Sequence, residues 1–287
     1  MKKILVPIDF SDSTWSVCRY AVMVAGNEPA EIHLFHSYFD QIIVTDSSFP
    51  TGIDTESMIN EQLLQDIKQR SEQDILDLQQ KLIDYLNKVG NPKSKVIFSI
   101  EGGEPEYEIL EMEEEYNPDL IVMGTRGTGA KGFLEGSVSR KIMNNAPVFA
   151  IPDINKLPDI AKVAYLSEIT EVDIPVIETI MSLLGKFNST VFYLHFLLDD
   201  DREKALTKLN PIQKHFADQE RDGLINYNII PENDIHEDIE NFIRSKDISL
   251  IAFIPHKKGF FKRLFFSGIS KKDLLQTNMP LLAIPEQ

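Results

Sequence analysis

Residues 120–139 read LIVMGTRGTGAKGFLEGSVS, and this segment indicates the fold of the chain more clearly than any other. An apolar run, Leu120–Met123, leads into a glycine-rich loop, and the loop ends at Gly136 and Ser137, where a helical pattern begins. A strand, a loop and a helix N-terminus in that order present backbone N–H groups and a positive helix end to phosphate. The segment therefore predicts a phosphate site, although the Lys-Ser/Thr pair of the P-loop pattern is absent.

The same loop also contains G-x-G-x-x-G at Gly127, Gly129 and Gly132, with Asp153 further along the chain. A dinucleotide-binding fingerprint shows this pattern, but there the glycines follow the first strand and lead directly into a long helix. Here the glycines follow the fourth predicted strand, and the helical pattern begins only at Ser137. The context therefore argues against a dehydrogenase-like site.

The two halves of the chain repeat one pattern. The matching segments are residues 119–123 with 249–253, 145–152 with 278–285, and 3–7 with 162–166. Internal repeats indicate that one structural unit occurs more than once. We therefore expect two domains of one kind, residues 1–154 and residues 155–287.

Within each half, short apolar runs alternate with longer amphipathic segments. The runs predict strands at residues 3–8, 31–36, 95–100, 119–123, 147–151, 161–166, 189–196, 224–230, 249–254 and 280–284. The amphipathic segments predict helices at residues 13–26, 57–89, 105–116, 137–145, 172–187, 201–219, 234–246 and 269–277. Continuously apolar strands are typical of parallel sheets that are buried on both faces. The pattern predicts an α/β protein with two Rossmann-like domains, each a five-stranded parallel sheet with helices on both faces.

The overall composition limits the partners that we expect. The chain carries 29 Lys and Arg against 45 Asp and Glu, a net charge of −16, which opposes binding to nucleic acid and to anionic membranes. No apolar run reaches the ~18 residues that a membrane-spanning helix needs. Cys18 is the single cysteine, which fits a reducing compartment. We therefore expect a cytoplasmic protein with no nucleic-acid or membrane partner.

Three separated motifs make the chain resemble the universal stress protein family. Residues 6–11, Val-Pro-Ile-Asp-Phe-Ser, are similar to the V-P-x-D-x-S pattern at the end of that family's first strand, and residues 103–110 resemble the segment before its third helix. Gly124, Gly127 and Gly136-Ser137 follow its nucleotide motif, G-x2-G-x9-G-[ST], with eight residues in place of nine between the last two glycines. The resemblance implies a tandem member, with domains of the HUP or adenine-nucleotide alpha hydrolase-like kind. It also implies ATP as the ligand, alone or with Mg²⁺.

The resemblance implies roles for five residues on the nucleoside side of such a site. Asp9 would face the nucleoside, and Pro7 would shape the turn that carries it. Ser37 would lie where the family contacts adenine through the backbone. Met123 and Gly124 would pass beneath the nucleotide.

The resemblance also implies a phosphate side. Gly127 would bring its N–H group close to phosphate. Four residues at the helix N-terminus would hold the phosphates: Gly136, Ser137, Val138 and Ser139. Glycines allow close approach, and hydroxyls add donors. The alternative is that the glycines only turn the chain and that Ser137 only caps a helix.

The second half has lost the nucleotide motif. Ile254 and Lys257 stand where the first two glycines stand in the first half, and Pro255 removes a donor. We also expect the acid of the first strand, Asp9, to have no counterpart, because Leu-Ser-Glu at residues 166–168 replaces Pro-Ile-Asp at residues 7–9. Residues 255–266 are basic and aromatic instead, which indicates either another binding surface or phenylalanines that fill the vacated pocket.

We expect a nucleotide-binding stress-response sensor or binding module without efficient catalysis. The alternatives are a slow ATPase or phosphotransferase, which would lack a catalytic lysine and an obvious base, and a partner-binding protein with a decayed site. His33 and His36 lie on opposite faces of a strand and are not expected to share a metal. Family domains pair through strands near their last strand, so we expect an intramolecular pseudo-dimer, and a homodimer is possible. The long connection at residues 40–56 is either a lid or a variable loop.

Overall fold

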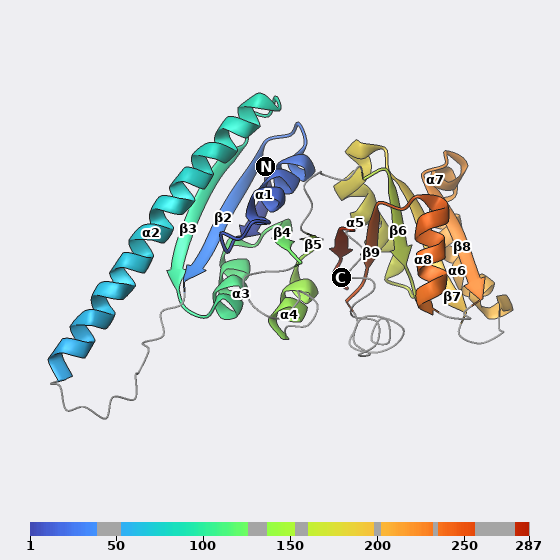
Figure 1. Ribbon diagram of the computed structural model, residues 1–287. Coiled ribbons are helices and arrows are strands. Elements are labelled where there is room, and N and C mark those ends of the chain that lie inside the picture. The colour runs from blue at the N-terminus through green and yellow to red at the C-terminus, as the bar shows by residue number, and fades with distance from the viewer. Residues whose placement is uncertain are drawn as a thin grey trace.

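Ten strands in the described part of the chain form one sheet in the computed structural model (Figure 1). The structure describes residues 1–38, 53–125, 137–152, 160–197, 202–231, 235–255 and 279–286, with the backbone alone at residues 53–61, 137–140, 235 and 236. The strands are β1 (Lys2–Pro7), β2 (Ala30–Tyr38), β3 (Lys95–Gly102), β4 (Leu120–Gly124), β5 (Val148–Ile151), β6 (Lys162–Leu166), β7 (Thr190–Leu197), β8 (Ile225–Pro231), β9 (Leu250–Phe253) and β10 (Leu281–Ala283). Their order across the sheet is β3-β2-β1-β4-β5-β10-β9-β6-β7-β8.

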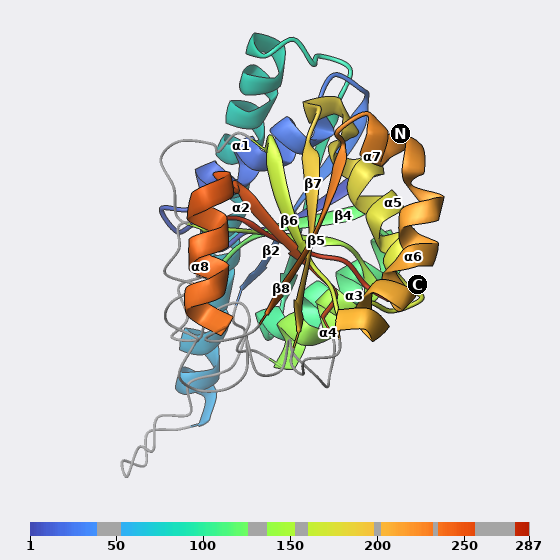
Figure 2. The ribbon, with the colours of Figure 1, turned by 90° about the vertical axis from the view of Figure 1, so that its right-hand side faces the viewer.

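Helices cover both faces of this sheet. The α-helices are α1 (Thr14–Ala25), α2 (Ile53–Lys88), α3 (Pro105–Tyr116), α4 (Ser137–Asn145), α5 (Asp173–Leu184), α6 (Arg202–His215), α7 (Ala217–Arg221) and α8 (Ile235–Lys246). Helices α1, α2, α5 and α6 contribute to one buried cluster, and α3, α4 and α8 contribute to a second cluster on the other face. Figure 2 shows α8 on one side of the strands, with α5 and α6 on the other. Among the described residues, no helix has both the length and the apolar character that crossing a membrane requires.

Strand β1 shows why continuous apolar runs become strands here. Ile4 and Val6 belong to the first buried cluster, Leu5 belongs to the second, and all three side chains are fully buried. Because side chains alternate between the faces of a strand, a strand that is covered on both faces is apolar at every position. The predicted α/β class, with helices on both faces, is confirmed.

The two halves of the sheet repeat one strand order. Strands β3-β2-β1-β4-β5 and strands β8-β7-β6-β9-β10 are each parallel throughout. The halves meet where β10 pairs antiparallel with β5, with Leu282 opposite Phe149. Each half thus joins the other through its last strand, as the resemblance implies. The expected domain boundary falls within residues 153–159, outside the described part, so the division into domains stays a prediction.

Two helices of the second half differ from the predicted ones. The helix predicted at residues 201–219 is interrupted at Phe216, which separates α6 from α7. Pro211 lies inside α6 and has no backbone N–H group, so one hydrogen bond of the helix cannot form. Phe216 is nearly fully buried, and its ring packs in the core where the helix ends. The helix predicted at residues 172–187 ends at Leu184 and continues as a 3-10 turn. The helix predicted at residues 269–277 lies outside the described residues.

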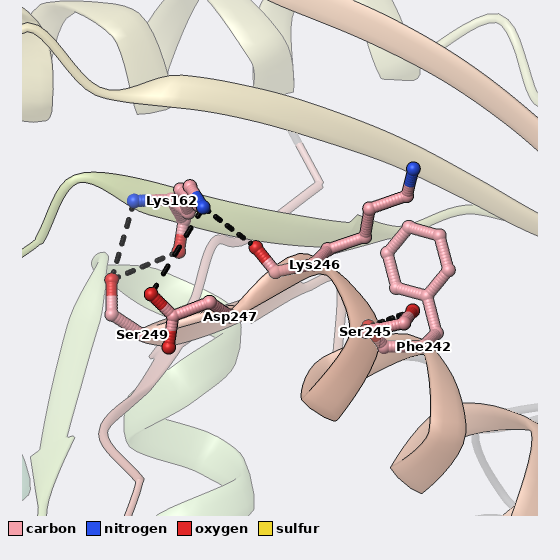
Figure 3. A network of polar contacts seen from close by, with 6 residues as sticks. All are labelled: Lys162, Phe242, Ser245, Lys246, Asp247 and Ser249. Atoms are coloured by element: carbon pink, nitrogen blue, oxygen red, sulfur yellow. Dashed lines mark hydrogen bonds and ion pairs between the residues drawn. The ribbon is translucent and has the colours of Figure 1, made fainter.

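A lysine in the first strand of each half caps a helix. Lys3 Nζ donates to the carbonyl of Tyr116 at 3.0 Å, and Lys162 Nζ donates to the carbonyl of Lys246 at 2.9 Å (Figure 3). These carbonyls end α3 and α8, where the helix dipole favours a cation. The repeat therefore extends from the strand order to individual side-chain contacts.

Cys18 is fully buried in α1, and burial raises the pKa of its thiol to about 12. Because the thiolate is the reactive form, we expect this thiol to be inert in the folded protein. An aromatic disulfide reagent such as DTNB should label the native protein no faster than the protein unfolds. It should label the single cysteine at once in guanidinium chloride, and fast labelling of the native protein would contradict the buried position.

Candidate functional site

The carboxyl ends of β1, β2 and β4 lie at one edge of the first half of the sheet. The chain passes from β1 to β2 through α1 on one face, and it reaches β4, on the other side of β1, through α3 on the opposite face. The connections therefore diverge between β1 and β4. Open α/β sheets bind ligands in the crevice at such a switch point. The strand order by itself marks this edge as the place for a ligand.

Pro7 and Asp9 lie where β1 turns towards α1. Pro7 is the last residue of β1 and pairs with Phe35 of β2. Asp9 is half-buried, and its Oδ1 atom accepts hydrogen bonds from the Ser11 N–H group at 3.1 Å and the Thr14 hydroxyl at 3.5 Å. These bonds hold the carboxylate within the turn at the switch point.

Ser37 lies on β2 beyond the last residue that pairs with β1. Its hydroxyl donates to the Gly103 carbonyl at 2.9 Å, and the Gly103 N–H group donates to the Tyr38 carbonyl at 2.9 Å. The Ser37 side chain is thus engaged with the end of β3. This leaves the backbone of β2 as the part of Ser37 that could contact a base.

Met123 and Gly124 end β4 next to β5. Gly124 pairs with Ile151, and the Thr125 N–H group donates to the Ile151 carbonyl at 2.8 Å. Because glycine has no Cβ atom, a ligand can approach the backbone closely at this strand end. The structure therefore brings Asp9, Ser37 and Gly124, which are far apart in the sequence, to neighbouring strand ends.

The phosphate side of the predicted site is only partly described. Gly127 and Gly136 lie outside the described residues. Ser137, Val138 and Ser139 form the first turn of α4, where the backbone alone is described. The helix begins at Ser137 as predicted, and a helix N-terminus offers N–H groups and a positive end to an anion. The roles of these five residues stay predictions.

The second half keeps the turn after its first strand. Phe10 and Ile169 occupy matching positions with φ angles of 54° and 53°. This match places Glu168 where Asp9 stands in the first half. The expectation that the second half has lost this acid is therefore wrong, because a carboxylate remains on a side chain that is one methylene longer.

The end of β9 differs more from its counterpart, the end of β4, than the turn after β6 differs from the turn after β1. Ile254 follows β9 at the position equivalent to Gly124, and its side chain is buried. A Cβ atom and a branched side chain thus stand where the first half has a glycine. Residues 256–266 of the basic and aromatic segment lie outside the described residues.

Sequence reasoning missed a buried polar network in the second half. The fully buried Asp173 accepts hydrogen bonds from the hydroxyls of Tyr165 at 2.7 Å, Tyr193 at 2.6 Å and Ser167 at 2.6 Å. Burial and then the charge of Asp173 raise the pKa of both phenols well above the usual range. The spacing Thr170-x-x-Asp173 before an apolar helix is a capping-box signal that could have drawn attention to this carboxylate.

Two hollows in the described part, of about 790 and 690 Å³, lie at the opposite, amino-terminal edge between the halves, and Lys2 and Glu28 line both. Lys186 of the second half lines the smaller hollow and donates to the Val24 carbonyl at the end of α1. Burial, and then the charge of Lys2, lower the pKa of Lys186 to about 8. This lysine joins the two halves at the edge away from the candidate site.

A doubly wound sheet whose connections diverge between β1 and β4 defines the class of this protein, the Rossmann-like α/β proteins. The profile of the universal stress protein family matches residues 1–149, and the chain belongs to that family. Universal stress protein MJ0531 of Methanocaldococcus jannaschii is 30% identical over 153 residues, which cover 52% of this chain and 81% of the relative. Universal stress protein YxiE of Bacillus subtilis is 30% identical over 152 residues, which cover 52% of this chain and 97% of the relative.

The likeness in fold extends over both halves. The crystal structure of a universal stress protein from Archaeoglobus fulgidus matches 99% of this chain and 96% of its own chain, with a TM-score of 0.68. The two sequences are 17% identical, so this likeness shows the fold alone.

Proposed function

We propose that the protein binds ATP or a related adenine nucleotide at the carboxyl edge of its first half, and acts in the cytoplasm as a stress-response sensor or binding module. The observation that carries the proposal is the meeting of Asp9, Ser37 and Gly124 at neighbouring strand ends beside the switch point. Family membership supports the proposal.

In the proposal, different residues of this edge contact the nucleoside and the phosphates. The Asp9 carboxylate accepts hydrogen bonds from the nucleoside, and the absence of a Cβ atom at Gly124 lets the nucleotide lie close to the sheet. The phosphates take N–H groups from the glycine loop and from the first turn of α4. Such local donors are needed because the net charge of −16 repels an anion. Mg²⁺, where present, would be bound by the phosphates of the nucleotide.

The second half, residues 155–287, has a different task in the proposal. The buried Ile254 at the position of Gly124 argues against a second nucleotide there. We propose that this half completes the sheet for the first half, residues 1–154, through the β5–β10 pair. The single nucleotide site then belongs to the first half.

Binding of Mg-ATP should stabilise the protein. Saturation a hundredfold above the dissociation constant adds about 2.7 kcal/mol to the free energy of unfolding, which urea titrations with and without nucleotide measure. Asp9→Ala should weaken binding by about 1.5–3 kcal/mol, since it removes a charged acceptor. The matched control Glu168→Ala, at the equivalent turn of the second half, should leave the affinity unchanged.

The other outcomes separate the alternatives. The absence of any stabilisation at millimolar Mg-ATP would contradict the proposal and favour a partner-binding protein with a decayed site. Steady phosphate release by the parent protein, abolished in Gly127→Arg, would favour a slow ATPase or phosphotransferase. Mass spectrometry of protein purified without added ligand would name any nucleotide that is retained.

A further inference from the structure

The turn after the first strand of each half, which carries Asp9 in the first half and Glu168 in the second, has an unfavourable backbone conformation. Phe10, directly after Asp9, has a φ of 54°, and Ile169, directly after Glu168, has a φ of 53°. Residues with a Cβ atom rarely occupy this left-handed region, and a β-branched isoleucine is especially disfavoured there. Such a conformation persists only where surrounding contacts hold it, and it is common at ligand sites.

A histidine holds this turn in each half. His36 Nδ1 lies 2.9 Å from the carbonyl oxygen of Ile8, and His195 Nδ1 lies 2.9 Å from the carbonyl oxygen of Ser167. Both carbonyls belong to the residue just before the acid. A carbonyl only accepts hydrogen bonds, so each Nδ1 carries the proton and donates it. The histidine thus bonds the second strand of its half to the turn after the first strand.

The two turns differ in what else supports them. In the first half the ring of Phe10 lies against the ring of His36, with centroids 4.6 Å apart. In the second half the Ile169 N–H group donates at 2.8 Å to the hydroxyl of Ser167, which is part of the Asp173 network. His36 therefore contacts its turn at two points, the Ile8 carbonyl and the Phe10 ring, whereas the second turn has the bond from Ile169 to Ser167 in addition to the one from His195.

We propose that His36 is a positioning residue for the nucleotide site, which acts through the Ile8 carbonyl and the Phe10 ring to hold Asp9 in the orientation that binds the nucleoside. This inference rests on the proposed function. It assigns His36 no contact with the nucleotide. In the second half the same histidine contact serves only the fold.

The experiment compares three variants with the parent by calorimetric titration with Mg-ATP. His36→Leu should weaken binding by about tenfold, the upper range for the loss of one hydrogen bond. His36→Asn should retain most of the affinity, because its amide nitrogen can donate from nearly the position of Nδ1. His195→Leu removes the same contact from the second half and should leave the affinity unchanged. Equal affinity in His36→Leu and the parent, or equal losses in His36→Leu and His195→Leu, would overturn the proposal.

A second measurement tests the turn without nucleotide. The Ser11 N–H group donates to Asp9 at 3.1 Å and so reports on the turn through its rate of hydrogen exchange. We expect faster exchange at Ser11 in His36→Leu, and restored protection in His36→Asn. If the parent binds no Mg-ATP, the proposed function fails, and this exchange rate still decides whether His36 holds the turn. Unchanged exchange in His36→Leu would overturn the proposal.

Discussion

Replacing Asp173 with alanine should lower the free energy of unfolding by about 3–5 kcal/mol, the largest effect that we expect from one polar residue in the described part. The carboxylate is fully buried and accepts bonds from two phenols, one hydroxyl and the Thr170 N–H group at 3.2 Å. Each buried donor that loses its acceptor costs about 1–3 kcal/mol. Ser167 and Tyr193 can still bond to each other, since their oxygens lie 2.6 Å apart. Urea unfolding measures the loss.

The matched control is Asp218→Ala on α7. The Asp218 side chain is 79% exposed and pairs with Arg221 at 3.0 Å. An exposed ion pair contributes less than about 1 kcal/mol, so the control should unfold close to the parent. Similar unfolding midpoints for Asp173→Ala and Asp218→Ala would show that the buried network does not hold the second half together.

Replacing Leu282 with aspartate should separate the unfolding of the two halves. Leu282 is fully buried in β10, opposite Phe149 of β5 and beside Ala252 of β9. A carboxylate there has no partner among the apolar residues of the first buried cluster, and burying it costs more than about 4 kcal/mol. The strand pair that joins the halves should therefore break first.

Two probes distinguish joint unfolding from separate unfolding. Trp15 is the single tryptophan and lies on α1 of the first half, so its fluorescence reports on that half, whereas far-UV circular dichroism reports on both. The two urea transitions should coincide in the parent and diverge in Leu282→Asp. The control Leu206→Asp, at a residue of α6 that is 46% exposed, should keep them together. Coincident transitions in Leu282→Asp would contradict the expected role of the β5–β10 pair.

The sequence was sufficient for central strands such as β1 because burial on both faces leaves an apolar signal at successive positions. Leu5 and its neighbours Ile4 and Val6 could only be a buried strand or a buried helix, and the short run excluded the helix. The break at Phe216 could not be predicted in the same way. Pro211 is a local signal inside α6, but the end of the helix also depends on the burial of the Phe216 ring in the core, and no local pattern records that burial.

In the candidate site, too, local motifs could be predicted and contacts between distant residues could not. Asp9 and Gly124 could be predicted as candidates because both belong to local motifs. The role of His36 could not, because the Ile8 carbonyl that it bonds is 28 positions away and comes near only when β1 and β2 pair. The Asp173 network likewise joins side chains from β6, β7 and α5, and its phenols resemble ordinary core aromatics in the sequence.

The position of β10 has a consequence for biosynthesis. This strand pairs with β5 at the centre of the sheet, yet its residues, Leu281–Ala283, are synthesised after those of the other nine strands. Until they emerge from the ribosome, the β5 edge of a completed first half has no partner within the described chain. An unpaired edge can recruit another strand, including the same edge of a neighbouring nascent chain. We therefore expect translation speed and early chaperone contact to affect the yield of folded protein.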